Sequence, residues 1–135
     1  MHRSRTSIAA LSLSVVLSAC SGATAVDGVS LSSAAAASEV IAEAPAGLVV
    51  LDVRTPAEFT DGHLADAINI DFYEADFADS LKALDRDVPY VLYCRSGNRS
   101  ATAAQIMRDL GFTEVYEVDG GILAWVQAGL PITNQ

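Results

Sequence analysis

Four short apolar segments, each followed by a stretch with helical signals, constrain the fold of this chain more than any other feature. Leu48–Val53 and Pro89–Tyr93 are almost continuously apolar, as expected of strands buried on both faces. Ala67–Ile70 and Val115–Val118 are shorter segments that we also interpret as strands. Strands that alternate with helices pair in parallel, so the sequence predicts a layered α/β fold.

The stretches between these segments carry helix start and stop signals. Thr55, Pro56 and Glu58 form a capping box with proline at the first helical position, which predicts a short helical turn. Gly111 is expected to close the helix before it, and Trp125 to pack in the core. The helices predicted elsewhere are 32–43, with Ser32 or Ser33 as the cap, 76–84, 100–110 and 121–128.

The N-terminus has the pattern of an export signal. Three basic residues precede the uncharged run Ile8–Ala19, which at about a dozen residues is too short to span a bilayer. Leu17-Ser18-Ala19-Cys20 resembles the lipobox of bacterial lipoproteins, in which the cysteine is lipidated and anchors the protein on the cell envelope, periplasmic or outer face. The alternative is cleavage after Ala23-Thr24-Ala25, which would give a soluble periplasmic or secreted protein. We therefore expect a signal peptide at 1–19, a flexible tether at 20–30 and a domain at 31–135.

Length and charge narrow the function classes. The chain has 135 residues, of which 51% are hydrophobic, enough for one domain with a packed core. Its formal net charge is −9, and loss of Arg3 and Arg5 with the leader would make it more negative. Because such a chain repels phosphate backbones, we do not expect it to bind nucleic acid.

Cysteine usage directs attention to Cys94. The sequence has two cysteines, and Cys20 is either lipidated or removed with the leader. Cys94 is then the only free thiol of an exported protein. Since oxidising compartments favour disulfides, an unpaired cysteine there calls for an explanation. This combination predicts a reactive cysteine.

The loop that follows Cys94 favours the thiolate. The strand delivers Cys94 to the carboxyl edge of the sheet, where ligands bind in open α/β folds. Gly97 and Asn98 permit a turn whose N–H groups point inward, and the next helix adds its unpaired N–H groups. Arg95 and Arg99 add two positive charges. Each feature lowers the pKa of a cysteine and forms a site for an anion.

Four motifs follow one another over about residues 30–132. They are Leu51-Asp52-Val53-Arg54 with Glu58-Phe59, Gly62-His63-Leu64 with Ala67-Ile68-Asn69, Cys94-Arg95-Ser96-Gly97-Asn98-Arg99-Ser100, and Asp119-Gly120-Gly121 with Trp125. In this order and spacing they resemble the motifs of the rhodanese family, in its exported single-domain form of the phage-shock kind.

The resemblance implies a three-layer α/β/α fold and thiosulfate sulfurtransferase activity. Cys94 would take sulfur from a small anion such as thiosulfate and pass it, as a persulfide, to a cyanide or thiol acceptor, either a small molecule or a group on a protein. The loop amides would stabilise the donor and the persulfide, and Arg95 and Arg99 would guide the donor. Substrate contacts are therefore expected from Arg95, Ser96, Gly97, Asn98, Arg99 and Ser100, and no metal or organic cofactor is implied.

Residues outside the loop are expected to support the site. Asp52 is interpreted mainly as the ion-pair partner of an arginine, and Arg54 as facing either the substrate or the same network. His63 is interpreted as structural. The family has Pro-Gly where this chain has Ala65-Asp66; aspartate tolerates positive φ, so we expect the turn to survive.

Two other functions remain open. Cysteine-dependent phosphatases and arsenate reductases also hold an oxyanion in a loop from cysteine to arginine, but that loop has one residue more than the four between Cys94 and Arg99. A shorter loop suits a sulfur-sized target. The other alternative is a non-catalytic sulfide or persulfide carrier or sensor, against which the presence of Cys94 argues.

Overall fold

The computed structural model describes residues 27–135, and its centre is a five-stranded sheet in which every pair of neighbouring strands is parallel. The strand order is β1-β5-β4-β2-β3. The strands are β1 (Val29–Ser32), β2 (Val49–Asp52), β3 (Ile68–Asn69), β4 (Tyr90–Tyr93) and β5 (Val115–Val118). The helices are α1 (Ala34–Glu43), α2 (Pro56–Asp61), α3 (Phe77–Lys82), α4 (Asn98–Asp109) and α5 (Gly121–Gln127).

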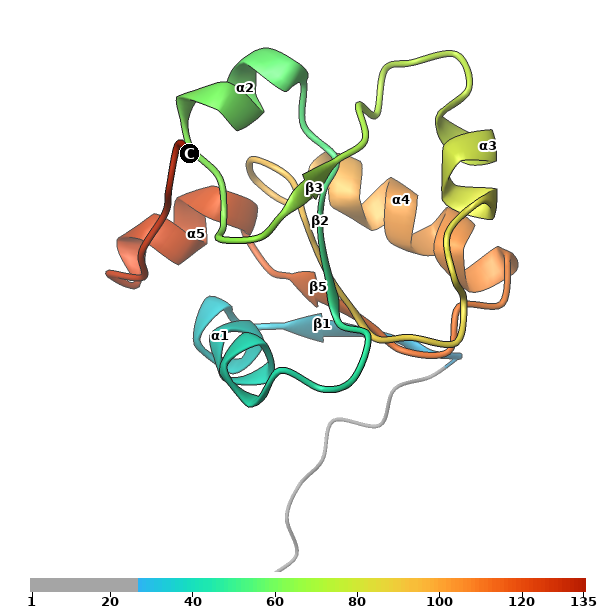
Figure 1. Ribbon diagram of the computed structural model, residues 1–135, viewed down its shortest axis with the longest axis horizontal. Helices are drawn as coiled ribbons and strands as arrows, with labels where there is room; N and C mark the ends of the chain where they lie inside the picture. Colours follow the sequence, from blue (N-terminus) through green and yellow to red (C-terminus); the bar gives the residue numbers. More distant parts are fainter. Residues whose placement is uncertain (1–26) are drawn as a thin grey trace, which may run out of the picture.

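Helices cover both faces of the sheet, which confirms the predicted three-layer α/β/α fold (Figure 1). α1 and α5 pack on one face around Val91, Tyr93 and Trp125, and α3 and α4 pack on the other around Leu92 and Met107. All four residues of β4 are buried, as predicted for a strand covered on both sides. Cys94 directly follows this central strand.

Capping residues in the sequence predicted where α1 and α2 begin. Ser33 caps α1, since its side chain accepts a hydrogen bond from the amide of Ala36. Thr55 and Glu58 form the predicted capping box of α2, which lies beyond the carboxyl ends of the central strands (Figure 1). α4 begins at Asn98 rather than Ser100, so the loop between Cys94 and this helix is shorter than predicted.

The edge strand β1 was not predicted, and the tether was predicted too long. β1 begins at Val29, inside the segment 20–30 that we interpreted as flexible, and it pairs with β5. Its sequence, Val-Ser-Leu-Ser, is short and half polar, and Leu31 is 62% exposed. An edge strand of this kind lacks the apolar run that marked the central strands.

The export signal, Cys20 and most of the predicted tether lie outside the described residues. Within residues 27–135, no helix is both long and apolar enough to cross a bilayer.

Candidate active site

The candidate nucleophile, Cys94, lies at the carboxyl end of β4, and the loop after it folds back over its sulfur. The residue is 1% exposed. The amide of Gly97 donates a hydrogen bond to Sγ at 3.1 Å, and the Ser100 hydroxyl lies 3.5 Å from Sγ. Gly97 has φ +105°, a conformation that favours glycine and that turns its amide toward the sulfur.

These contacts favour the thiolate of Cys94. Burial alone would raise the pKa of the thiol, because a charge is costly away from water. The Ser100 hydroxyl and the amides of Ser100, Gly97 and Ser96 outweigh burial and lower the pKa of Cys94 below its ordinary value. Neutral hydrogen-bond donors therefore shift the buried sulfur toward its ionised, nucleophilic form.

The start of α5 fixes the outer side of the same loop. The amide of Ile122 donates to the carbonyl of Cys94 at 2.9 Å, and that of Leu123 to the carbonyl of Arg95 at 3.1 Å. Gly121 (φ +61°) lies so close that a Cβ there would come within 2.4 Å of the Cys94 carbonyl oxygen. Because α5 holds the loop carbonyls, the loop amides are left to face the sulfur.

The two loop arginines differ in their contacts. The guanidinium of Arg99 donates two hydrogen bonds, both of 2.8 Å, to the carboxylate of Glu58 on α2. These hydrogen bonds are the main reason why the pKa of Glu58 falls to about 2. Arg99 therefore joins α4 to α2, and its charge is largely balanced. Arg95 is exposed and, within residues 27–135, forms no ion pair.

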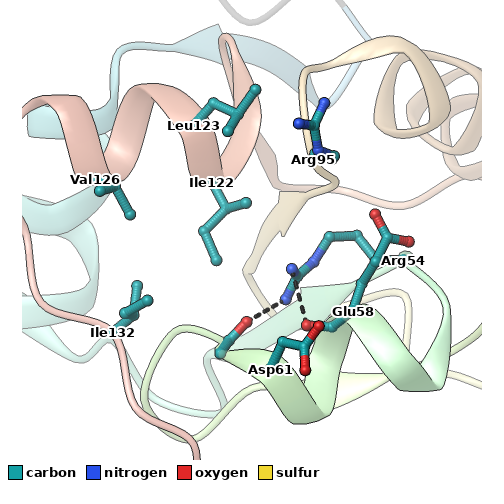
Figure 2. Close-up of a pocket in the computed structure, with 9 residues that line it drawn as sticks. Arg54, Glu58, Asp61, Arg95, Ile122, Leu123, Val126 and Ile132 are labelled. Atoms are coloured by element: carbon teal, nitrogen blue, oxygen red, sulfur yellow. Dashed lines mark hydrogen bonds between the residues drawn. The ribbon is translucent and has the colours of Figure 1, made fainter.

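A cavity of about 350 Å³ lies beside Arg95 (Figure 2). In the close-up, apolar side chains of α5 and the C-terminal segment face Arg54 and the two carboxylates of α2 across it. The lining residues are Arg54, Glu58, Asp61, Gly62, Arg95, Ile122, Leu123, Val126 and Ile132. Arg95 is thus placed to attract an anion toward a site with one apolar wall.

Asp52 and Arg54 form a buried ion pair next to this cavity. Nε of Arg54 donates to both carboxylate oxygens of Asp52, at 3.0 and 2.9 Å, and Nη2 donates at 2.5 Å. The same guanidinium donates to the carbonyls of Glu58 at 3.2 Å and Gly62 at 2.7 Å, drawn as dashed lines in Figure 2. Arg54 therefore connects β2 to α2 and also borders the cavity. Its position fits both roles considered for it, a part of the ion-pair network and a residue that faces the substrate.

The segment around His63 has structural contacts. Nδ1 of His63 lies 2.8 Å from the carbonyl oxygen of Phe59, and its ring stacks on that of Phe59 with centroids 3.8 Å apart. Its backbone pairs with Thr133. Asp66 has φ +60°, so the turn keeps the positive φ for which we expected aspartate to be suited.

One buried carboxyl group near the sulfur was missed by the sequence reasoning. Glu117 on β5 is 8% exposed, and Ser100 Oγ lies 2.9 Å from its Oε1. Burial raises the pKa of Glu117 more than the Ser100 hydrogen bond lowers it. The available signal was a lone charged residue inside the apolar strand Val115–Val118. Its partner could not be read from the sequence.

Comparison with known families decides the classification. The family model described as "Rhodanese-like domain" matches residues 33–128, from the cap of α1 to the end of α5. The chain belongs to the rhodanese-like family. Cys94, Ser100, Asp52 and Arg54 all lie within the matched region.

Curated relatives of this rhodanese-like protein carry sulfurtransferase names. It is 40% identical over 85 residues to a "Sulfurtransferase" of Allochromatium vinosum, an alignment covering 63% of this chain and 78% of the relative. It is 39% identical over 79 residues to "Thiosulfate sulfurtransferase GlpE" of Pseudomonas syringae, covering 58% and 73%. Among solved structures, a rhodanese-related protein from Thermoplasma volcanium matches with a TM-score of 0.67 and 36% identity, covering 77% of this chain and 97% of that one.

Proposed function

We propose that this protein is a sulfurtransferase that carries sulfane sulfur on Cys94. The observation that supports it most directly is the environment of the buried Cys94 sulfur: Sγ accepts a hydrogen bond from the Gly97 amide and lies 3.5 Å from the Ser100 hydroxyl, and the pKa of Cys94 is lowered. A thiolate in a cradle of neutral donors can attack sulfur and can hold the negatively charged persulfide that results. The names of the relatives in Allochromatium and Pseudomonas point to the same chemistry.

The reaction proceeds in two displacements. The Cys94 thiolate attacks the outer sulfur of a thiosulfate-like donor, a new S–S bond forms, and the donor's S–S bond breaks with its electron pair leaving on sulfite. A cyanide or thiol acceptor, small or on a protein, then attacks the outer sulfur of the persulfide. The Cys94 thiolate leaves from that sulfur and is regenerated, so the cycle needs no redox partner.

The arginines have separate roles in this proposal. Arg95, exposed at the cavity, attracts the anionic donor against the acidic background of the chain. Arg99 holds α2 against the loop through its ion pair with Glu58. Because this pair balances its charge, Arg99 contributes to the donor site by fixing the position of α2 rather than by attracting the donor.

A phosphatase or arsenate reductase is less well supported. The turn from Cys94 to the start of α4 leaves three intervening residues, and it directs the amide of Gly97 to the sulfur at 3.1 Å. A small ring of this kind fits a sulfur atom better than a tetrahedral phosphate. A sulfide or persulfide carrier would use the same cysteine. It would differ from a sulfurtransferase only in the rate at which it releases sulfur to the acceptor.

Intact mass spectrometry tests the proposal. The purified protein incubated with thiosulfate should gain the mass of about one sulfur atom, and cyanide should remove it. Cys94→Ser should gain nothing and lose thiocyanate formation by at least about a thousandfold. Cys20→Ser, which changes the other cysteine of the sequence, is the control and should behave as wild type. Absence of the adduct with hydrolysis of an aryl phosphate would overturn the proposal in favour of a phosphatase.

We further propose that the protein is exported and anchored on the cell envelope through lipid on Cys20. The lipobox-like sequence and the short apolar run before it support this placement. Cys20→Ala should move the protein from the membrane fraction to the soluble fraction of cells. Membrane retention that is unchanged in this variant would reject the lipid anchor.

A further inference from the structure

Glu117 is a buried titratable group beside the reacting sulfur that the two displacements do not use. It belongs to β5, in register with Leu92 of β4, and faces α4. Ser100, on the first turn of α4, lies between Glu117 and Cys94: its Oγ is 2.9 Å from Glu117 Oε1 and 3.5 Å from Cys94 Sγ. A continuous chain of polar atoms thus joins the carboxyl group to the sulfur.

The Ser100 hydroxyl has one proton and three neighbouring acceptors. These are the carboxyl group of Glu117, the sulfur of Cys94 and the carbonyl of Gly97, which lies 3.2 Å away. An ionised carboxylate at 2.9 Å is the strongest acceptor and the nearest, so it takes the proton and turns it away from the sulfur. A protonated Glu117 instead donates to a lone pair of Ser100 Oγ, which frees the Ser100 proton for Sγ.

We propose that Glu117 is a positioning residue that controls, through the hydroxyl orientation of Ser100, whether the Cys94 sulfur receives this hydrogen bond. The proposal rests on Cys94 being the reacting sulfur of the proposed function. In the protonated state, Glu117 stabilises the thiolate and the persulfide; in the ionised state, it withdraws that donor.

The surroundings allow Glu117 to change its protonation state. A second cavity, of about 380 Å³, is lined by Glu117 together with Val29 and Leu31 of β1. The other charged groups facing Glu117 are Asp119 on its own chain segment and Arg108 on α4. The Cys94 thiol is connected to Glu117 only through the Ser100 hydroxyl. β1, the neighbouring strand on that side, has no charged residue. Burial and Asp119 favour the protonated form, and Arg108 favours the ionised form.

The pH dependence of Cys94 alkylation tests this inference without any sulfur donor. The rate of reaction of the purified protein with iodoacetamide gives the pKa of Cys94. Glu117→Gln replaces the ionisable carboxyl group with a neutral amide, which is a weaker acceptor than a carboxylate and can donate to Ser100 at every pH. This change should lower the pKa of Cys94 by at least about half a pH unit. In the Ser100→Ala background the same change should have less than about half of this effect, because the connecting hydroxyl is gone.

Controls separate the inference from trivial effects and from the proposed function. Glu114→Gln makes the same chemical change at an exposed position just before β5 and should leave the alkylation profile of wild type. An equal shift in the Ser100 and Ser100→Ala backgrounds would mean that the charge of Glu117 acts through space, and would overturn the inference. No shift at all would overturn it as well. The proposed function fails separately, by absence of the sulfur adduct.

A measurement on proteins that keep Glu117 covers the case in which Glu117→Gln does not fold. NMR of ¹³C-labelled glutamate gives the pKa of the Glu117 carboxyl group directly. Since coupling between two ionisations is reciprocal, Cys94→Ser should lower the pKa of Glu117 relative to wild type. A Glu117 titration that does not respond to Cys94→Ser would also overturn the inference.

Discussion

The N-termini of α4 and α5 meet at the Cys94 loop and are used in opposite ways. Both helices follow a glycine with positive φ, Gly97 (φ +105°) and Gly120 (φ +73°), and neither has a side-chain cap. The amides at the start of α5 donate to the carbonyls of Cys94 and Arg95. At the start of α4, amides face Cys94 Sγ instead.

The difference shows two uses of a helix N-terminus without a side-chain cap. Its free amides either fix a neighbouring loop, which we call a clamp, or form a binding site for an anion. Unpaired N–H groups at a helix start require acceptors. α5 finds them in the protein backbone, so its dipole fixes the loop. α4 finds them in a sulfur that becomes charged, so its dipole stabilises the thiolate and the anion that reacts with it. The site therefore depends on both helices: the amides of α5 bind the loop carbonyls, and the amides of α4 remain free to face the sulfur.

The largest effect is expected from breaking the clamp with Gly121→Ala. The new methyl group would lie within 2.4 Å of the Cys94 carbonyl oxygen and 2.6 Å of the Arg95 carbonyl oxygen. We expect a loss of about 2–4 kcal/mol in unfolding free energy and at least about a hundredfold in thiocyanate formation. Urea denaturation and a thiosulfate–cyanide assay measure the two quantities.

Gly129→Ala is the matched control for the clamp. Gly129 also has positive φ (+75°), but a Cβ there meets nothing within 4 Å. The Gly129→Ala variant should lose about 1 kcal/mol of unfolding free energy through backbone strain, and its rate of sulfur transfer should be unchanged. If both variants lost only stability, the contact of α5 with the loop would have no part in the reaction.

A smaller effect is expected from weakening the open end of α4 with Ser100→Ala. This change removes the hydroxyl that contributes most to lowering the pKa of Cys94 while keeping the amides. The pKa of Cys94 should rise by about one pH unit, and sulfur uptake below the new pKa should fall about tenfold. Thr102→Ala, at an exposed position of the same helix, should leave both unchanged. A Cys94 pKa unaffected by Ser100→Ala would leave the amides as the sole stabilising groups.

The contrast between the two helix ends also marks what the sequence could predict. The Cys94 loop was predictable because its signals are local: an apolar strand, a glycine at the turn and a helix start within a few residues. The parallel sheet followed from the alternation of elements, since connections of that length allow few other arrangements.

The partners of the loop were not predictable, because they come from distant parts of the chain. Arg99 was expected to guide the donor, yet its carboxylate partner lies 41 residues away, at the start of α2. Ser100 and Glu117 are 17 residues apart, and the amides of α5 reach Cys94 from the following strand–helix unit. The edge strand β1 was likewise missed, because it buries too little apolar surface to leave a pattern. β3, at the opposite edge, lies within the predicted strand Ala67–Ile70.

The smallest effect is expected at α2, whose N-terminus is capped by side chains and so serves neither as clamp nor as site. Glu58 accepts from Thr55 in the capping box and from Arg99, and its folded pKa of about 2 lies below the ordinary 4.5. A depressed folded pKa adds stability that is complete above about pH 4.5 and is lost as the pH falls toward 2. Glu58→Gln should cost about 1–2 kcal/mol of unfolding free energy at pH 7, because the pair is partly open to solvent, and should flatten this acid loss.

Urea denaturation between pH 7 and pH 2 measures the effect of Glu58→Gln, with Glu39→Gln on the exposed face of α1 as the control. Sulfur transfer at pH 7 should fall only a few-fold, because the amide at position 58 still accepts one hydrogen bond from Arg99 and the amides of α4 are untouched. A loss as large as that of Gly121→Ala would instead mean that α2 helps to hold the loop as firmly as α5 does. α2 would then be a second helix that fixes the Cys94 loop, although its own N-terminus is capped by side chains.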